Sequence, residues 1–239
     1  MSLNETEWFV EAYEDQTAFA VRYTKELVDQ AGPFQRIQVF QSTAMGRVLI
    51  LNGCFMVTEK DAFIYHEMLV HPAMRTLTRP KRVLIIGGGD GGAVTEAVKY
   101  PGVESVTLCE IDKMVVDCCR DHFPEISRGL DDPRVKTVYD DGAAFVRNHE
   151  GYFDLIMVDS TDPVGPAQAL YETDFYQAVK RGLTSEGIAV FQTESPLFMP
   201  AVFAEAEAKL KSVFGGPAVR PYFAVIPCYP GGLWSFTMC

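Results

Sequence analysis

Short runs in which apolar and polar residues alternate, separated by turn signals, fill the first part of the chain. Alternation at period two indicates a strand with one buried face, and four runs are predicted as strands: 17–28, 34–40, 47–51 and 54–58. Asn52-Gly53, between the last two runs, is a strong signal for a hairpin turn. The pattern predicts a small β-hairpin or meander domain at the N-terminus.

A helical pattern follows over 61–74. Thr58 and Asp61 resemble a capping box that opens this helix. Pro72 is expected to bend or end it, because proline lacks a backbone N–H and its ring crowds the preceding turn. We place the helix with the strands before it, so the N-terminal β-strand domain is predicted to cover residues 1–76.

Strand-like runs alternate with helical ones from residue 77 onward. The predicted strands are 82–86, 105–110, 135–139, 153–159 and 187–192. The helices between them are 93–100, 113–122, 142–149 and 171–183. Such alternation predicts a parallel sheet with helices on both faces. After a helix over 200–214, the runs 218–226 and 233–238 predict an antiparallel hairpin at the sheet edge. The predicted fold class is therefore α/β, with a Rossmann-like sheet in residues 77–239.

Composition and charge exclude several classes of protein. Hydrophobic residues make up 48% of the 239 residues, enough to bury a large core, and no apolar run reaches the ~20 residues of a membrane helix. The formal net charge is 21 − 32 = −11, which argues against a nucleic-acid partner. The six cysteines form no C-x-x-C pair and no zinc spacing. The N-terminus shows no signal peptide, so we expect a reduced, cytoplasmic chain with no metal and no membrane partner.

A glycine-rich turn follows the first strand of the predicted parallel sheet. Gly87, Gly89 and Gly92 satisfy G-x-G-x-x-G between a strand and a helix, where glycines let a ligand approach the helix N-terminus. Glu110 ends the second strand, 110 − 87 = 23 residues after Gly87, and a carboxylate there can accept hydrogen bonds from two ribose hydroxyls. Together these features favour an adenosine ligand over a plain strand-to-helix turn.

Two further acids narrow the identity of that ligand. Asp90 lies inside the glycine turn, where it would repel a pyrophosphate or a carboxylate by roughly 1 kcal/mol or more and attract an ammonium. Asp141, after the third strand, is placed to accept a hydrogen bond from an adenine amine. Decarboxylated S-adenosylmethionine, an adenosine with a sulfonium and an amine but no carboxylate, fits both acids. The alternative is that Asp90 only caps the following helix.

Asp159 ends the fourth strand and Asp162 follows it, at the edge where ligands of doubly wound sheets bind. Two carboxylates this close raise the pKa of one of them, which suits a general base, and together they form a socket for ammonium groups. The alternative is a turn built on aspartate and proline. The stretch 163–166 is predicted to be a lid loop, with residues 163–170 mobile without ligand and ordered with it.

Several motifs, taken in order, resemble those of the polyamine aminopropyltransferases, and most closely the spermidine synthases within that family. They are Tyr65-His66-Glu67-Met68, Gly87-Gly88-Gly89-Asp90-Gly91, Glu110-Ile111-Asp112, Asp140-Asp141-Gly142, Asp159-Ser160-Thr161-Asp162-Pro163, Gln192-Thr193-Glu194-Ser195-Pro196 and Ile226-Pro227-Cys228-Tyr229-Pro230-Gly231-Gly232. The resemblance implies a methyltransferase-type Rossmann sheet behind the N-terminal β-domain. It also implies aminopropyl transfer from decarboxylated S-adenosylmethionine to putrescine, giving spermidine and methylthioadenosine, with no cofactor besides this consumed co-substrate.

Site residues carry over from the resemblance position by position. Asp159 matches the proposed catalytic base. The positions that match nucleoside-binding residues are Gln35, His66, Asp90, Glu110, Asp141, Gly142 and Pro166. The positions for the diamine are Tyr65, Asp159, Asp162, Gln192 and Tyr229. We also expect a homodimer or a higher homo-oligomer, because the meander leaves strand edges that a second subunit can cover.

Two positions depart from the family pattern. Met56 stands where the family usually has a glutamine, and a thioether cannot replace an amide contact. Thr95 stands where the family often has an arginine. Another acceptor (cadaverine, agmatine or spermidine) therefore stays open beside putrescine. An S-adenosylmethionine-dependent methyltransferase, a non-catalytic binding protein and, more distantly, a dehydrogenase are the alternatives of other classes.

Overall fold

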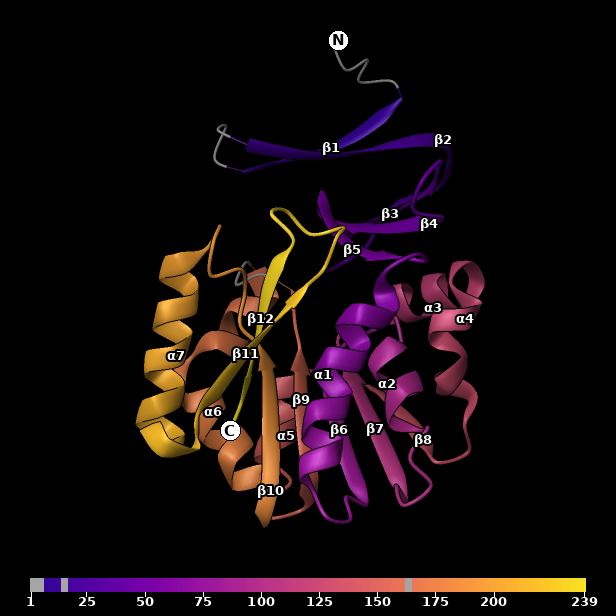
Figure 1. The fold of residues 1–239 in the computed structure, drawn as a ribbon. Helices are drawn as coiled ribbons and strands as arrows, with labels where there is room; N and C mark the ends of the chain where they lie inside the picture. Colours follow the sequence, from indigo (N-terminus) through magenta and orange to yellow (C-terminus); the bar gives the residue numbers. More distant parts are fainter. Residues whose placement is uncertain (1–6, 14–16, 162–164) are drawn as a thin grey trace.

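The computed structural model describes residues 7–13, 17–161 and 165–239, and these form two sheets (Figure 1). The N-terminal sheet is an antiparallel meander whose strands lie side by side in chain order: β1 (Trp8–Tyr13), β2 (Thr17–Ala31), β3 (Arg36–Ser42), β4 (Arg47–Leu51) and β5 (Cys54–Thr58). The pattern missed β1, because Trp8, Phe9 and Val10 stand side by side instead of alternating with polar residues. The other four strands and the turn at Asn52-Gly53, with φ of 51° and 89°, are confirmed.

Each face of the N-terminal sheet buries an apolar cluster. On one face Phe55 meets the rings of Phe9 and Phe19, each at 5.1 Å between centroids. The opposite face packs against helix α3 (Lys113–His122), whose Val115 joins the apolar residues of β3, β4 and β5. The second cluster therefore holds the N-terminal sheet against the rest of the chain.

Helix α1 (Ala62–Thr76) connects the two sheets and continues through Pro72. Pro72 therefore does not end the helix, and the bend stays a prediction. Pro72 has no N–H to donate to the carbonyl of Met68, four residues earlier. The hydroxyl of Tyr222, from strand β11 (Arg220–Val225), donates to that carbonyl instead, at 2.9 Å. A tertiary contact thus replaces the hydrogen bond that the proline removes.

The predicted capping box at Thr58 and Asp61 forms only in part: the Thr58 hydroxyl oxygen accepts from the Asp61 N–H at 3.4 Å. The helix begins at Ala62, and the side chain of Asp61 caps none of its backbone N–H groups. Asp61 instead accepts hydrogen bonds from the Thr58 hydroxyl and, at 2.8 Å, from the backbone N–H of Cys228. Since Cys228 follows strand β11, this carboxylate joins the start of α1 to the C-terminal part of the chain.

The larger sheet has seven strands in the order β11-β12-β10-β9-β6-β7-β8. Its strands besides β11 are β6 (Arg82–Gly87), β7 (Ser105–Glu110), β8 (Val135–Tyr139), β9 (Phe153–Asp159), β10 (Leu183–Gln192) and β12 (Leu233–Met238). Strands β10, β9, β6, β7 and β8 are parallel, whereas β12 and β11 form the predicted antiparallel hairpin at one edge. The connecting helices besides α1 and α3 are α2 (Gly92–Ala97), α4 (Pro124–Ser127), α5 (Gly142–Arg147), α6 (Thr173–Gly182) and α7 (Pro200–Phe214). The 3-10 segments are η1 (Arg128–Asp131), η2 (Gly165–Tyr171) and η3 (Gly216–Ala218).

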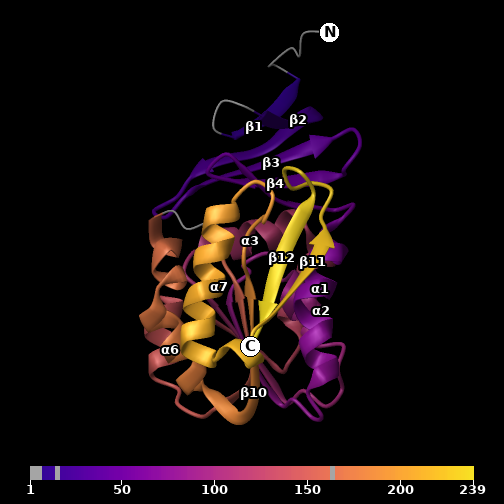
Figure 2. The same ribbon diagram turned by 60° about the vertical axis from the view of Figure 1, so that its left-hand side comes forward.

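Helices cover both faces of this sheet, as the sequence predicts, and Figure 2 shows α6 and α7 on one side and α1 and α2 on the other. Alternate residues of β6 face opposite ways. Val83 and Ile85 pack with residues of α1 and α2, whereas Leu84 and Ile86 pack with residues of α5, α6 and α7. The carboxyl ends of β6, β7 and β9 point toward the N-terminal sheet (Figure 1).

Helix α2 is shorter than the predicted 93–100. The Arg134 guanidinium, from the loop before β8, donates to the carbonyls of Val98 and Tyr100 at 2.5 and 3.1 Å. These carbonyls would accept backbone hydrogen bonds if the helix continued. Thr95 on this helix accepts a hydrogen bond from Gly129 N at 2.9 Å and donates to a carbonyl of α4 at 2.6 Å. This departure from the family pattern therefore joins α2 to the α4–η1 segment.

The α/β fold class, a Rossmann-like methyltransferase-type sheet with a small N-terminal β-domain, is confirmed. The domain boundary at 76/77 stays a prediction, since α1 packs on α2 and on strands of the larger sheet. Among the described residues, no helix has the length and apolar character needed to cross a membrane.

Candidate active site

A cavity of about 180 Å³ lies where the carboxyl ends of β6, β7 and β9 face the N-terminal sheet. Every predicted site residue that the structure describes with its side chain lines this cavity: Gln35, Tyr65, His66, Asp90, Glu110, Asp141, Gly142, Asp159, Gln192 and Tyr229. Asp162 lies outside the described residues, as does the side chain of Pro166. The structure thus brings together residues from both sheets and from α1.

The glycine turn after β6 is folded tightly against Asp159. Gly87 and Gly88 have φ of 78° and 68°, in the left-handed region that favours glycine. The Gly88 N–H donates to the backbone carbonyl of Asp159 at 2.9 Å. A Cβ on Gly87 would lie 2.2 Å from that carbonyl oxygen, and one on Gly88 would lie 2.7 Å from Asp159 Oδ2. The turn therefore has no side chains between its backbone and the carboxylate.

Asp90, inside the same turn, has two kinds of partner. Its Oδ1 accepts a hydrogen bond from the Gly92 backbone N–H at 2.6 Å, so the helix-capping alternative describes one of its contacts. His66 Nε2, from α1, lies 3.1 Å from Oδ1 and 3.3 Å from Oδ2. Asp90 is therefore both a local cap and half of an ion pair that faces the cavity.

His66 is almost fully buried, with 3% of its surface exposed. Burial alone would lower the pKa of His66, but the charge and the hydrogen bond of Asp90 raise it, helped by Asp159 and Glu96, and the net result is a raised pKa. The imidazole consequently retains its proton to a higher pH than an exposed histidine does.

Asp159 ends β9, and only one of its two carboxylate oxygens has a hydrogen-bond partner among the described residues. Its Oδ1 accepts a hydrogen bond from the Tyr65 hydroxyl at 2.6 Å. Its buried Oδ2 has no hydrogen-bond partner among the residues that the structure describes. Burial and the nearby charge of Asp90 raise the pKa of Asp159 to about 6, although His66 and Tyr65 act in the opposite direction. A carboxylate of this kind can accept a proton from a ligand.

Glu110 and Gln35 lie on the side of the cavity formed by β7. Glu110 is 8% exposed and accepts a hydrogen bond from the Asp112 N–H at 2.9 Å. Burial raises its pKa to about 7, with a smaller contribution from the charge of Asp112. Gln35 Nε2 donates to Asp112 Oδ2 at 3.1 Å, while Asp112 Oδ1 caps α3 through Met114 N at 3.0 Å. Asp112 thus holds the amide of Gln35 beside the carboxylate of Glu110.

Asp141 and Gly142 form the next corner of the cavity, after β8. Asp141 Oδ1 caps α5 by accepting from Ala144 N at 2.9 Å, and the residue stays exposed. A Cβ on Gly142 would lie 2.2 Å from Cγ2 of Ile86, so only glycine lets α5 approach β6 this closely. Asp141 therefore lines the cavity while it also caps α5.

Gln192 and Tyr229 line the cavity but also hold neighbouring segments in place. Gln192, 3% exposed, has its Nε2 within hydrogen-bond distance of Ser160 O (2.9 Å), the Tyr171 hydroxyl (2.5 Å) and Glu194 Oε1 (3.2 Å). The Tyr229 hydroxyl donates to a backbone carbonyl of β5 at 3.0 Å. Both side chains therefore support the wall of the site as well as facing it.

Three cavity residues with polar or aromatic side chains were not predicted from the sequence to belong to the site: Glu11, Asp61 and Trp234. Glu11 on β1 is 6% exposed, and its Oε2 accepts from Phe55 N at 2.8 Å. Trp234 on β12 meets Tyr229 edge to face at 4.6 Å between centroids. A single acid in a surface-like strand gives no local signal of a site, so only the packing of β1 over the cavity identifies Glu11.

Two groups of side chains have the spacing of metal ligands among the described residues. They are His66, Asp90 and Asp159 in the cavity and Glu67, His71 and Glu96 outside it, with the ligand atoms of each group within 4.8 Å of one another. In the second group, Glu96 also binds Lys99 at 2.5 Å. The cavity group combines two carboxylates with a histidine, and its two acids suit an ammonium ligand.

Comparisons with known proteins agree over nearly the whole chain. Residues 62–239 match the model of the spermine/spermidine synthase domain, and residues 7–59 match that of the spermidine synthase tetramerisation domain. Polyamine aminopropyltransferases of Thermoanaerobacter sp. (strain X514) and Clostridium beijerinckii are each 45% identical over 231 residues, covering 97% and 96% of this chain and 83% and 81% of their own.

Solved structures give the same result. A spermidine synthase in complex with the transition-state analogue AdoDATO matches all of this chain and 81% of its own, with a TM-score of 0.95 and 37% identity. The spermidine synthase of Thermotoga maritima matches all of this chain and 80% of its own, with a TM-score of 0.93 and 37% identity. The chain therefore belongs to the polyamine aminopropyltransferase family.

Proposed function

We propose that this protein transfers the aminopropyl group of decarboxylated S-adenosylmethionine to putrescine, giving spermidine and methylthioadenosine. The observation that carries the proposal is the state of Asp159. Asp159 lines the cavity, its Oδ1 is held by Tyr65, its buried Oδ2 has no hydrogen-bond partner among the described residues, and the charge of Asp90 helps to raise its pKa. A proton acceptor and a second acid in one pocket suit a reaction between an amine and a cationic donor.

The nucleoside occupies the side of the cavity next to the glycine turn. Glu110 accepts hydrogen bonds from the ribose hydroxyls on the side of the cavity that Gln35 also lines. Asp141 accepts a hydrogen bond from the adenine amine. Asp90 attracts the ammonium of the aminopropyl group and would repel the carboxylate of ordinary S-adenosylmethionine. The same acid weighs against the methyltransferase alternative.

The attacking amine must lose a proton before it can react. An alkylamine with a pKa near 10.4 is about 3.4 units above pH 7, so the neutral form costs about 4.6 kcal/mol at 1.36 kcal/mol per unit. Asp159 accepts that proton, and its raised pKa of about 6 narrows the gap between donor and acceptor. The unpartnered Oδ2 is the oxygen that is left to take up this proton, since Oδ1 already accepts from Tyr65. Attack on the carbon beside the sulfonium neutralises the leaving group as the carbon–sulfur bond breaks.

Two carboxylates from different elements suit an acceptor with two ammonium groups. Asp159 lies at the end of β9, whereas Glu11 comes from β1 and lines the cavity from the N-terminal sheet. Trp234 and Tyr229 supply apolar and aromatic surface in the same cavity, which suits the methylene chain of a diamine. Cadaverine, agmatine and spermidine share this pattern and are the alternative acceptors.

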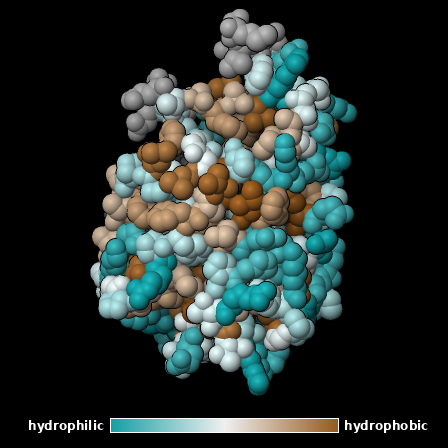
Figure 3. Space-filling model, in the orientation of Figure 1, coloured by the Kyte–Doolittle hydropathy of each residue, from teal (hydrophilic) through white to brown (hydrophobic). Residues whose placement is uncertain are grey.

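A homo-oligomer is part of the proposal. The first residues of the chain match a domain model that is described as a tetramerisation domain. Apolar residues gather in a band across the middle of one face (Figure 3). Large apolar side chains that stay exposed among the described residues include Phe63 (55%), Leu197 (63%), Phe223 (48%) and Val225 (64%). A contiguous apolar surface is typical of contacts between proteins.

An acceptor panel tests the proposed reaction. Putrescine, cadaverine, agmatine and spermidine are each incubated with the enzyme and decarboxylated S-adenosylmethionine, and the products are identified by mass spectrometry. We expect the highest kcat/KM for putrescine, with spermidine and methylthioadenosine formed in equal amounts. A methylated amine formed from S-adenosylmethionine would establish the methyltransferase instead. A higher kcat/KM for another amine would replace putrescine and leave the reaction class intact.

A further inference from the structure

We propose that His66 exchanges its proton for the ammonium group of the nucleoside: the cation that binds Asp90 displaces one proton from the imidazole to solvent. His66 is then a positioning residue that acts through Asp90 and makes substrate affinity depend on pH. The inference rests on the proposed function, because it concerns the aminopropyl arm of decarboxylated S-adenosylmethionine.

Packing holds the His66 imidazole against Asp90. Nε2 lies 3.1 and 3.3 Å from the two oxygens of Asp90. The ring packs directly on the start of α2, where a Cβ on Gly92 would lie 2.1 Å from Cε1 and 2.4 Å from Nε2. Only 3% of the residue is exposed. The imidazole therefore cannot turn away from Asp90 when a ligand arrives without moving α1 relative to α2.

The charged groups that face His66 from the surrounding elements are acids. Asp90 comes from the turn after β6, Asp159 from the end of β9 and Glu96 from α2. Glu96 is already paired with Lys99 at 2.5 Å and with His71 at 3.1 Å. On α1 itself, His66 stands between two titratable residues, Glu67 and Tyr65, and the ring of Tyr65 lies 5.5 Å from the imidazole. Asp90 is thus the partner whose charge the imidazolium balances.

An arriving ammonium competes for the same carboxylate. If His66 kept its proton, two cations would share Asp90 inside a buried pocket, with the sulfonium as a third positive charge nearby. Like charges held this close in a buried pocket repel each other strongly, because little water is present to screen them. Loss of the imidazole proton avoids that cost, because the proton that leaves offsets the ammonium that enters and only the sulfonium adds to the net charge of the site.

The exchange fixes the sign of the pH dependence. The pKa of free His66 lies above its usual value of 6.5, and binding of the ammonium lowers it. Affinity for decarboxylated S-adenosylmethionine should therefore weaken as pH falls through that pKa, by up to about tenfold per pH unit for one exchanged proton. Methylthioadenosine lacks the ammonium and should not show this dependence.

Two other acids of the site also titrate, and the choice of ligands and pH separates them. Glu110, with a pKa of about 7, faces the ribose that both ligands share, so its effect cancels in the ratio of the two dissociation constants. Asp159, with a pKa of about 6, is mostly ionised between pH 6.5 and 8.5. The ratio measured in that window isolates His66.

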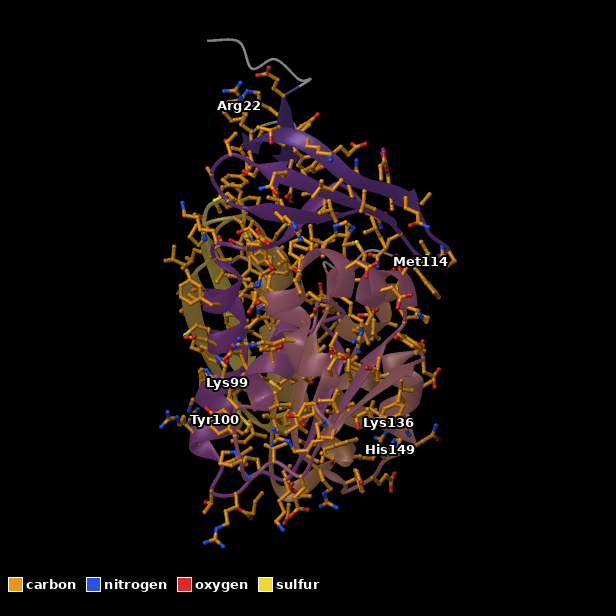
Figure 4. All side chains as sticks on the ribbon, turned by 90° about the vertical axis from the view of Figure 1, so that its right-hand side faces the viewer. Arg22, Lys99, Tyr100, Met114, Lys136 and His149 are labelled. Carbon is orange, nitrogen blue, oxygen red and sulfur yellow. The ribbon has the colours of Figure 1, made fainter. Side chains whose placement is uncertain are left out.

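The experiment measures both ligands by titration calorimetry on the wild type, His66→Gln and His149→Gln. Glutamine keeps an N–H donor for Asp90 but cannot titrate. His149 is the control: its Nδ1 lies 2.8 Å from the carbonyl of Phe145, it does not line the cavity, and it lies toward the end of the molecule away from the N-terminal sheet (Figure 4). Buffers of different ionisation enthalpy give the number of protons released.

At pH 6.5 we expect the wild type and His149→Gln to release more than half a proton on binding decarboxylated S-adenosylmethionine, and fewer on binding methylthioadenosine. The ratio of dissociation constants should change severalfold across the window in these two proteins and less than twofold in His66→Gln. An unchanged slope and proton release in His66→Gln would overturn the inference. Failure of the wild type to bind decarboxylated S-adenosylmethionine at any pH would overturn the proposed function itself.

A direct titration covers the case in which His66→Gln does not fold, which loss of methylthioadenosine binding would reveal. The His66 imidazole of the wild type is followed by NMR with each ligand bound. Its pKa should fall by at least one unit on going from the methylthioadenosine complex to the decarboxylated S-adenosylmethionine complex. A pKa that stays equal or rises would refute the exchange.

Discussion

The properties of Asp159 come from neighbours that are distant in the chain. Tyr65 of α1 binds one carboxylate oxygen at 2.6 Å, and the absence of a side chain on Gly88 leaves room for the other. Asp90 adds the negative charge that, with burial, raises the pKa of Asp159 to about 6. An oriented, partly satisfied carboxylate is what proton transfer from an amine requires.

Asp159→Asn should slow aminopropyl transfer by ~10²–10⁴-fold, the usual contribution of a positioned base, because the amide still accepts from Tyr65 but takes up no proton. The dissociation constant for methylthioadenosine should change by less than about threefold. Steady-state kinetics and calorimetry check the two expectations. Asp140→Asn is the control, since Asp140 is an exposed acid on the same sheet edge that does not line the cavity. Near-normal turnover of Asp159→Asn at pH 7.5 would remove Asp159 as the base.

Glu110→Gln should stabilise the unliganded protein at pH 8. Burial raises the folded-state pKa of Glu110 from 4.5 to about 7, so ionisation opposes folding, and this cost grows as pH rises from about 4.5 to 7 and then persists. The variant should gain about 2–3 kcal/mol in free energy of unfolding at pH 8 and much less at pH 5. Urea titrations at both pH values measure the difference. If the gain were equal at both, ionisation of Glu110 would not be its cause.

The glycine turn shows that one motif serves two physical needs. Left-handed φ values occur at Gly87, Gly88 and Gly91, of which only Gly87 belongs to G-x-G-x-x-G. Gly89 and Gly92 have no such φ and are glycine for lack of space: a Cβ would lie 3.1 Å from Glu110 Oε2 in the first case and 2.1 Å from the His66 ring in the second. The motif thus marks where β6, α2 and α1 approach one another.

Gly92→Ala should lower both stability and nucleoside affinity, because the new methyl group occupies the position of the buried His66 ring. Overpacking of this kind costs typically 1–3 kcal/mol, and relief by movement of His66 would weaken its contact with Asp90. Gly102→Ala is the control, since a Cβ there meets nothing within 4 Å. Urea unfolding should distinguish the two variants by at least 1 kcal/mol. Equal stability would show that α1 and α2 separate without cost.

Much of the fold and of the site could be predicted because their signals are local. The site residues at the carboxyl ends of β6, β7 and β9 have such signals, because Glu110 and Asp159 end buried strands and Asp90 stands in the glycine turn after one. Glu11 and Asp61 carry no comparable signal. Glu11 lies in a strand whose apolar and polar residues do not alternate regularly. Asp61 has the sequence position of a helix cap, and its contact with the Cys228 N–H comes from a distant part of the chain. Their roles depend on how the two sheets pack.

That packing makes the cavity a property of the whole molecule. Val115 of α3 is buried in one cluster with residues of the N-terminal sheet. Arg47 of β4 donates to the carbonyl of His122 at 2.6 Å, and Tyr229 donates to that of Met56 at 3.0 Å. Because these contacts surround the cavity, loss of the N-terminal sheet would also open the site. We therefore expect both sheets to unfold together.

Asp61→Ala should weaken this connection. It leaves the buried N–H of Cys228 and the Thr58 hydroxyl without their acceptor, and each such loss costs about 1–3 kcal/mol. We expect a loss of about 2–4 kcal/mol in free energy of unfolding. Asp29→Ala, which removes a surface ion pair with Arg36, should cost less than about 1 kcal/mol.

The two tryptophans report on the sheets separately, since Trp8 lies on β1 and Trp234 on β12. Variants with a single tryptophan, made by Trp8→Phe or Trp234→Phe, allow the urea midpoint of each sheet to be measured by fluorescence. The two midpoints should coincide when Asp61 is present, because the shared cluster and the Asp61 contacts couple the sheets. With Asp61→Ala they should move to lower urea, and the Trp8 signal should change first. Separate midpoints with Asp61 in place would mean that the N-terminal sheet unfolds on its own and that the cavity opens before the larger sheet does.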